Sequence, residues 1–229
     1  MNLKKMALLV CTLVFLFGGT ASAAPFFGLV DWVTDQGVGL FEGDGEVGPG
    51  VGGQVFDVEY MALKNTGSEL FFALQTGFDV TGTVQNLLPG DISIDLLSDG
   101  SYDYAIDFSD IQTFDLIEVA AWNPVKYPQH SIAGPWSVAT GDVRGDDLST
   151  IDLEVVNDNQ GAHYVLFGSV GIESFRDLAS FSCVTMNWTM ECGNDYGQTS
   201  ACPVVPEPAT MSLIGMSVVG LLAKRKFSK

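Results

Sequence analysis

The sequence predicts an all-β protein whose main domain is an antiparallel β-sandwich of the jelly-roll type. The apolar segments are short, and several of them alternate between apolar and polar residues with a period of two. Glycine occurs 26 times among the 229 residues, and turn-forming residues separate the apolar segments. About eight short strands joined by such turns are typical of a sandwich. Long helices are expected only in the terminal segments.

The first predicted hairpin follows a Gly- and acid-rich segment, residues 25–53, which is expected to form an edge strand and loops. Residues 55–63 (VFDVEYMAL) alternate, so Val58 and Tyr60 are predicted to lie on the same face of a strand. The turn NTGS leads back into a second apolar strand at residues 70–76.

A second hairpin is predicted further along the chain. Residues 91–96 (DISIDL) alternate, and Asp99 and Gly100 form a tight turn into a strand at residues 102–108. Further strands are expected at residues 116–122, 151–156, 163–172 and 179–189, and a short helical turn at residues 173–178. The acidic sandwich domain is therefore predicted to extend over residues 24–203.

The chain begins with the three parts of a secretory signal peptide, residues 1–23. The basic start MNLKK is followed by an apolar segment, residues 6–19, and then by the small residues TASA. We expect cleavage between Ala23 and Ala24. A retained N-terminal helix is the alternative, but the apolar segment is short for a membrane span.

A second apolar segment, residues 209–223, lies close to the C-terminus and is followed at once by Lys224, Arg225 and Lys226. As a helix it would be about 22 Å long, whereas a bilayer core needs about 20 residues. It is therefore predicted to be a short transmembrane helix, marginal as a permanent span. The positive-inside rule places its basic end in the cytoplasm.

Pro206, Glu207 and Pro208 precede this apolar segment. The triplet, the apolar helix and the basic tail, in this order, resemble the PEP-CTERM sorting signal of bacterial surface proteins, here residues 204–229. The resemblance implies that an exosortase, an integral-membrane transpeptidase similar to a cysteine protease, removes the tail. The protein is then expected to be exported, anchored transiently in the membrane through residues 209–223, and delivered to the cell surface or extracellular matrix. A simple tail anchor is the alternative.

The charge of the chain is distributed unevenly. Its formal net charge is −18, but six of the ten basic residues lie in the two terminal signals. Residues 25–205 carry 27 carboxylates and four basic side chains, which makes their net charge −23. The four are Lys64, Lys126, Arg144 and Arg176. Such a domain repels nucleic acid and anionic lipid, so nucleic-acid binding is excluded as a function.

Three cysteines remain after removal of the signal peptide: Cys183, Cys192 and Cys202. A disulfide is expected among them because exported proteins fold in an oxidising compartment. The spacing offers Cys183 with Cys192 or Cys192 with Cys202, and either choice leaves one thiol over. A zinc site is not expected, because the chain has no Cys-x-x-Cys motif and only two histidines.

Four acidic residues are candidate ligands of a structural calcium ion: Asp57, Glu59, Asp91 and Asp95. Calcium takes six to eight oxygen ligands, mostly from carboxylates and carbonyls. Asp57 and Glu59 are predicted to share one strand face. The alternative is that these carboxylates are solvated, and no cofactor is assigned with certainty.

The strand pattern supports a further resemblance, which covers about residues 55–190. The segments QVFDVEYMALKNTGSELFFALQTGF, PGDISIDLLSDGSYDYAIDF and HYVLFGSVGIESF resemble the superfamily of family-9 carbohydrate-binding modules and DOMON domains. The resemblance implies a sandwich that could take a polysaccharide as partner. Phe167 departs from the pattern, since it stands where a Glu is expected. The segment WTMECGND also resembles a phrase common near the end of exosortase-dependent surface proteins.

Four aromatic residues are candidates for stacking against sugar rings: Trp122, Tyr127, Trp136 and Tyr164. The alternative is that they close the edge of the sandwich. No motif for nucleophilic catalysis or phosphate binding occurs. The sequence therefore predicts a secreted, exosortase-processed surface or matrix protein without catalytic activity. The alternative is an extracellular carbohydrate-binding module stabilised by calcium.

Overall fold

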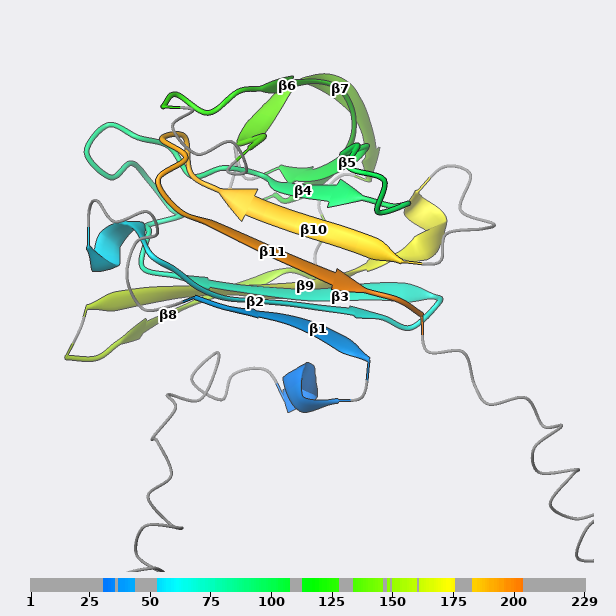
Figure 1. The fold of residues 1–229 in the computed structure, drawn as a ribbon, viewed down its shortest axis with the longest axis horizontal. Helices are drawn as coiled ribbons and strands as arrows, with labels where there is room; N and C mark the ends of the chain where they lie inside the picture. Colours follow the sequence, from blue (N-terminus) through cyan, green and yellow to red (C-terminus); the bar gives the residue numbers. More distant parts are fainter. Residues whose placement is uncertain are drawn as a thin grey trace, which may run out of the picture.

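The computed structural model describes residues 31–35, 37–43, 53–107, 113–127, 134–145, 148, 150–159, 161–175 and 183–203. Two antiparallel β-sheets form most of the regular secondary structure in this part of the chain and pack against each other (Figure 1). The all-β sandwich predicted from the sequence is confirmed. The predicted signal peptide (1–23) and the predicted sorting signal (204–229) lie outside the described residues. Among the residues that are described, none of the helices has the length and hydropathy of a membrane span.

The first sheet has five strands in the order β1-β2-β3-β9-β8. Their bounds are β1 (Val38–Glu42), β2 (Val58–Asn65), β3 (Glu69–Thr76), β9 (Ala162–Gly171) and β8 (Asp152–Asn157). The predicted first hairpin is present as β2 and β3, and β9 pairs with β3 along its whole length. This pairing brings residues near positions 60, 75 and 164 side by side, although they are far apart in the sequence.

The second sheet has six strands in the order β11-β10-β4-β5-β6-β7. Their bounds are β11 (Tyr196–Ala201), β10 (Val184–Thr189), β4 (Ile92–Asp95), β5 (Tyr104–Asp107), β6 (Asp115–Asn123) and β7 (Ser137–Gly145). The described residues also form three short 3₁₀ helices: η2 (Asp31–Thr34), η3 (Gln54–Phe56) and η4 (Ile172–Ser174). The predicted helical turn near residue 173 corresponds to η4.

The hydrophobic core lies between the two sheets. Trp188, Phe72 and Phe78 are among its largest fully buried side chains, and the rings of Phe78 and Trp188 meet edge to face with centroids 6.4 Å apart. A smaller apolar cluster lies on the other face of the five-stranded sheet, where Trp32 and Val33 of η2 pack against that sheet. This second cluster explains why β2 and β3 are apolar on both faces.

One strand-face prediction is wrong. Val58 and Tyr60 were predicted to lie on the same face, but Val58 belongs to the main core with Met61, and Tyr60 packs in the outer cluster with Ala62. The physical reason is a β-bulge, because the register between β2 and β3 shifts between Val58 and Tyr60. A bulge adds one residue to one strand and so reverses the alternation beyond it.

Candidate functional site

The four predicted calcium ligands do not form a common site. Glu59 lies in β2 of the five-stranded sheet, and Asp57 directly precedes that strand. In the other sheet, Asp91 directly precedes β4 and Asp95 is its last residue. Within the described part of the chain, no three His, Cys, Asp or Glu side chains are grouped so that they could hold a metal ion. The structure therefore does not bring these four residues together as one calcium site.

Two of these carboxylates hold the backbone in place. The side chain of Asp95 accepts hydrogen bonds from the backbone N–H groups of Leu97, Asp99 and Gly100, at 3.1, 3.2 and 2.7 Å. Those bonds close the turn after β4. Asp91 Oδ2 accepts a bond of 2.7 Å from the backbone N–H of Val138. Carboxylates that accept backbone N–H bonds stabilise local structure without any metal.

A buried polar cluster surrounds Glu59. The imidazole of His163, which is 2% exposed, lies between two carboxylates: its Nδ1 is 2.5 Å from Glu59 Oε1, and its Nε2 is 3.0 Å from Asp158 Oδ1. Gln75 Nε2 donates to Glu59 Oε2 at 2.5 Å, and Gln54 Nε2 donates to Glu59 Oε1. We call Glu59, His163, Asp158, Gln75 and Gln54 the buried polar cluster, after its buried members Glu59, His163 and Gln75.

The charges of this cluster favour a protonated histidine. Burial lowers the pKa of His163, but the hydrogen bonds and negative charges of Asp158 and Glu59 outweigh that effect and raise its pKa above the ordinary value. Both ring nitrogens are held by carboxylates, and the ring is closed off from solvent. This arrangement suits a structural ion pair better than a proton-transfer role, for which a ring nitrogen must reach a substrate. No motif in the sequence marks a partner for this histidine, because Glu59 lies 104 positions away.

A cleft of about 770 Å³ lies on the β7 side of the six-stranded sheet. Its walls come from β7, from the β5 end, and from the loop between β3 and β4. Residues lining the cleft include Thr81, Thr83, Asp91, Asp107, Trp136 and Thr140. The volume falls within the range of small-molecule sites, about 300–1,000 Å³.

The four aromatic candidates do not form a common stacking face, because only Trp136 of the four lines the cleft. Trp122 packs edge to face against Tyr102 and donates its indole N–H to the Tyr102 carbonyl at 2.9 Å. Tyr164 packs against the main core, and Tyr127 is 51% exposed. For Trp122 and Tyr164, the structure therefore favours the packing alternative.

The segment WTMECGND forms the turn between β10 and β11 and connects the two sheets. The indole N–H of Trp188, in the core, donates to the Gly90 carbonyl at 2.8 Å. Thr189 Oγ1 donates to the Asp195 carbonyl at 2.6 Å, which closes the turn. Asp195 Oδ2 accepts a 2.7 Å bond from the backbone N–H of Val58 in the opposite sheet. The segment WTMECGND thus closes the β10–β11 turn and contacts the opposite sheet.

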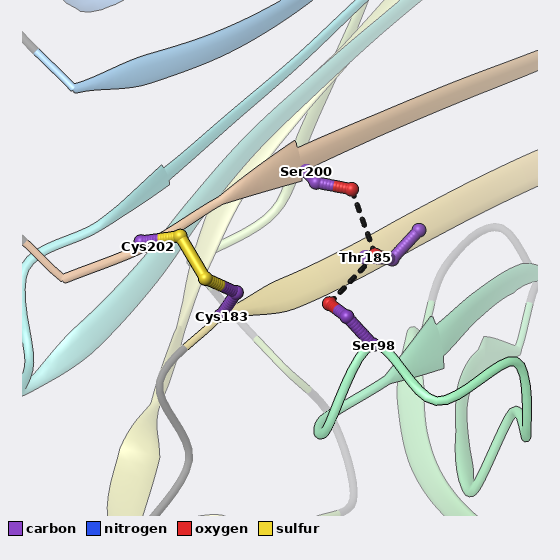
Figure 2. The surroundings of a disulfide bond; sticks show 5 residues. All are labelled: Ser98, Cys183, Thr185, Ser200 and Cys202. Atoms are coloured by element: carbon purple, nitrogen blue, oxygen red, sulfur yellow. Dashed lines mark hydrogen bonds between the residues drawn. A yellow bond between two sulfur atoms is a disulfide. The ribbon is translucent and has the colours of Figure 1, made fainter.

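The disulfide joins Cys183 and Cys202, and both pairings considered from spacing are wrong (Figure 2). These residues flank the last paired positions of β10 and β11, which places their Cα atoms 4.0 Å apart. Antiparallel pairing, not sequence spacing, decides which cysteines meet. Cys192 keeps a free, buried thiol, and burial raises its pKa.

A short hydroxyl chain lies beside the disulfide. Thr185 Oγ1 is 2.7 Å from Ser200 Oγ across the β10–β11 pair and 2.8 Å from Ser98 Oγ in the turn after β4 (Figure 2). The last strand is therefore held at its C-terminal end by a covalent bond and by side-chain hydrogen bonds.

Residues 204–226 match the PEP-CTERM protein-sorting motif. The chain carries a PEP-CTERM signal. It indicates an exported surface protein that is anchored transiently in the membrane and processed by an exosortase. The match includes the predicted signal residues Pro206, Glu207 and Pro208 and the basic residues 224–226. The PEP-CTERM signal begins at Val204, the second residue after the disulfide-bonded Cys202.

No curated protein and no solved structure matches the chain. The resemblance of the sandwich to family-9 carbohydrate-binding modules and DOMON domains therefore has no support beyond the sequence pattern and the all-β fold.

Proposed function

We propose that this protein is a non-catalytic component of the cell surface or extracellular matrix. Its precursor is exported through the signal peptide, held in the membrane by residues 209–223, and released or transferred when an exosortase cuts near Pro206 to Pro208. The observation that carries this proposal is the PEP-CTERM signal at residues 204–226, which follows directly on a folded, disulfide-bonded sandwich. The order of folded domain, motif and apolar segment is the order that tail removal requires.

The composition of the domain fits an extracellular location. Residues 25–205 carry a net charge of −23, and such a charge keeps copies of the protein apart and soluble outside the cell. The chain also has a Cys183–Cys202 disulfide. Disulfides persist in oxidising compartments and are rare in cytosolic proteins.

Processing can be tested by expressing the full-length chain in a host with an exosortase and in the same host with the exosortase deleted. We expect the mature protein to lack residues 209–223 only when the enzyme is present, as read by mass spectrometry of its C-terminal peptide. Replacing Pro206, Glu207 and Pro208 by alanine should leave the protein in the membrane fraction. Glu154→Ala, an exposed change on β8, is the control and should be processed normally. A surface protein that keeps its tail in the host with the enzyme contradicts the proposal.

The absence of catalysis is part of this proposal and needs its own test. The burial of His163 between two carboxylates supports it, because that imidazole cannot act on a bound substrate. Full-length protein in mild detergent is incubated with soluble polysaccharides, and reducing ends are measured. Hydrolysis that disappears when an acid pair is replaced by amides would show an enzyme.

Carbohydrate binding is a second candidate function. The observation in its favour is the cleft beside β7, where Trp136 and several hydroxyl side chains line a volume suited to a small ligand.

A further inference from the structure

We propose that the cleft beside β7 binds a neutral sugar unit of an extracellular polysaccharide, with Trp136 as the stacking residue. The inference rests on the proposed function, because only an exported protein meets such a polymer.

The rim of the cleft is held rigidly by its own backbone. Asp91 donates its N–H to the Trp136 carbonyl at 2.7 Å and accepts the Val138 N–H at 2.7 Å, so the start of β7 is fixed from both sides of Trp136. The preceding Gly90 allows this close approach. A Cβ at Gly90 would lie 1.9 Å from the Thr189 carbonyl oxygen and 2.4 Å from that of Trp136. A site that is formed before the ligand arrives loses less ordering entropy on binding.

The lining offers the groups that a sugar requires. Thr81, Thr83 and Thr140 supply hydroxyls, which donate and accept hydrogen bonds. Asp91 and Asp107 place carboxylates at the wall of the cleft, and Asp91 Oδ2 already accepts the Val138 N–H. Trp136 adds an aromatic surface for the apolar C–H face of a pyranose ring.

The charge of the lining disfavours an acidic ligand. None of the residues lining the cleft is basic, and two of them are carboxylates. An acidic sugar or a phosphate would enter a site of its own charge without a partner, which is unfavourable. Among the described residues, the cleft also lacks the third carboxylate or histidine that would make a metal site.

Binding can be measured by affinity electrophoresis of the full-length protein in mild detergent. The gels contain dextran, mannan, xyloglucan or a mixed-linkage β-glucan as neutral polymers, alginate as an acidic polymer, and chitosan as a cationic one. We expect retardation by at least one neutral polymer, unchanged by EDTA and by moderate salt. Retardation by chitosan alone, by alginate alone, or by no polymer overturns the proposal.

Three variants decide whether the cleft is responsible. Trp136→Ala should bind the retarding polymer about tenfold more weakly, since it loses the stacking surface. Thr140→Gln places a longer neutral side chain at an exposed cleft position without removing core contacts, and it should also weaken binding. Tyr127→Ala removes an exposed aromatic outside the cleft and is the matched control.

Equal retardation of wild type, Trp136→Ala and Thr140→Gln would overturn the site even if the polymer binds elsewhere. The assay uses unprocessed protein, so a negative binding result would not contradict exosortase processing. Conversely, if the tail is not removed even in the host that has the exosortase, the binding result still stands. If Trp136→Ala does not fold, as judged by its melting curve, the result for Thr140→Gln alone shows whether the cleft is the binding site.

Discussion

The imidazole of His163 and the carboxylate of Glu59 lie 2.5 Å apart in the buried polar cluster, although 104 positions separate them in the sequence. Strand β3 connects them, since it pairs with β2 on one side and β9 on the other. Asp158, at the end of β8, approaches the second ring nitrogen at 3.0 Å. The imidazole and the two carboxylates thus link β2, β9 and the turn after β8 at one end of the five-stranded sheet.

Replacing His163 by alanine should strongly destabilise the fold. The change leaves Glu59 buried without its cationic partner, and breaking a buried ion pair in this way costs about 3–5 kcal/mol. Lys64→Ala is the control, because the Lys64–Asp35 pair is partly exposed and such pairs contribute about 0–1 kcal/mol. Urea unfolding followed by tryptophan fluorescence measures both. A loss for His163→Ala no greater than that for Lys64→Ala would contradict a stabilising ion pair.

The stability contributed by His163 should fall as the pH rises. Its pKa in the folded state is raised by Asp158 and Glu59 against the effect of burial, so the folded protein holds this proton more tightly than the unfolded chain. The contribution is complete below the unfolded pKa of about 6.5 and is lost as the pH passes the folded pKa. The measurement is the free energy of unfolding at about pH 6 and about pH 8.

His163→Gln is the control for this pH dependence. Glutamine keeps a hydrogen-bond donor between the carboxylates but does not titrate, so the difference between wild type and variant isolates the histidine from the many acids of the domain. The charged and polar groups around the ring are Glu59, Asp158 and Gln54. If the difference between wild type and variant is the same at both pH values, the imidazole is not protonated in the fold.

The local parts of the fold could be predicted from sequence. The β2–β3 and β4–β5 hairpins follow from alternation and turn residues within a few positions. Strand β7 (SVATGDVRG) was missed because it is an exposed edge strand with few apolar residues. Strand β11 (YGQTSA) was missed because its buried positions carry only small or polar residues. Edge strands need few apolar residues, and so they lack the periodic pattern.

The candidate sites could not be predicted, because they depend on pairing between distant strands. The bulge in β2 reverses the strand face beyond Val58, and no residue type in VFDVEYMAL marks it. The pairing of Glu59 with His163 and of Cys183 with Cys202 follows from strand order and register. Trp136 was identified as an aromatic candidate, but only the folded structure places it at the cleft beside Asp91.

Removing the disulfide should loosen the end of the chain that carries the PEP-CTERM signal. Cys183 and Cys202 close a loop with a sequence separation of 19, and chain-entropy arguments assign about 3 kcal/mol to a loop of this size. The β10–β11 hairpin is closed by its turn at one end and by the disulfide at the other. We expect the double change Cys183→Ser and Cys202→Ser to lower the melting temperature and to increase hydrogen exchange in β11 more than in β4.

Cys192→Ala is the matched control for the disulfide. It removes the free thiol and leaves the Cys183–Cys202 bond, so its melting temperature should still fall when a reductant is added. The double serine variant should not respond to the reductant. A wild-type protein whose melting curve is the same with and without reductant would show that the bond does not stabilise the fold.

The edges of the two sheets meet at Gly39, where β1 lies against β11. A Cβ at Gly39 would be 2.0 Å from the Ser200 carbonyl oxygen and 2.7 Å from Thr199 Oγ1, so backbone and side chain of β11 occupy the space. Because Ser200 belongs to the paired register of β11 with β10, it cannot move away without weakening those hydrogen bonds. Gly39→Ala should therefore separate the two edges at a cost of about 1–3 kcal/mol, the usual range for overpacking.

Gly82→Ala is the matched control for this close approach. Among the described residues, its Cβ would meet only Asp79 Oδ2 within 4 Å, at 3.9 Å, so the same change should alter stability by less than about 0.5 kcal/mol. Urea unfolding compares the two variants, and hydrogen exchange shows whether β1 and β11 lose protection together. Loss of protection in β1 alone would mean that the two edges do not support each other, because a shared contact must weaken both strands when it is broken.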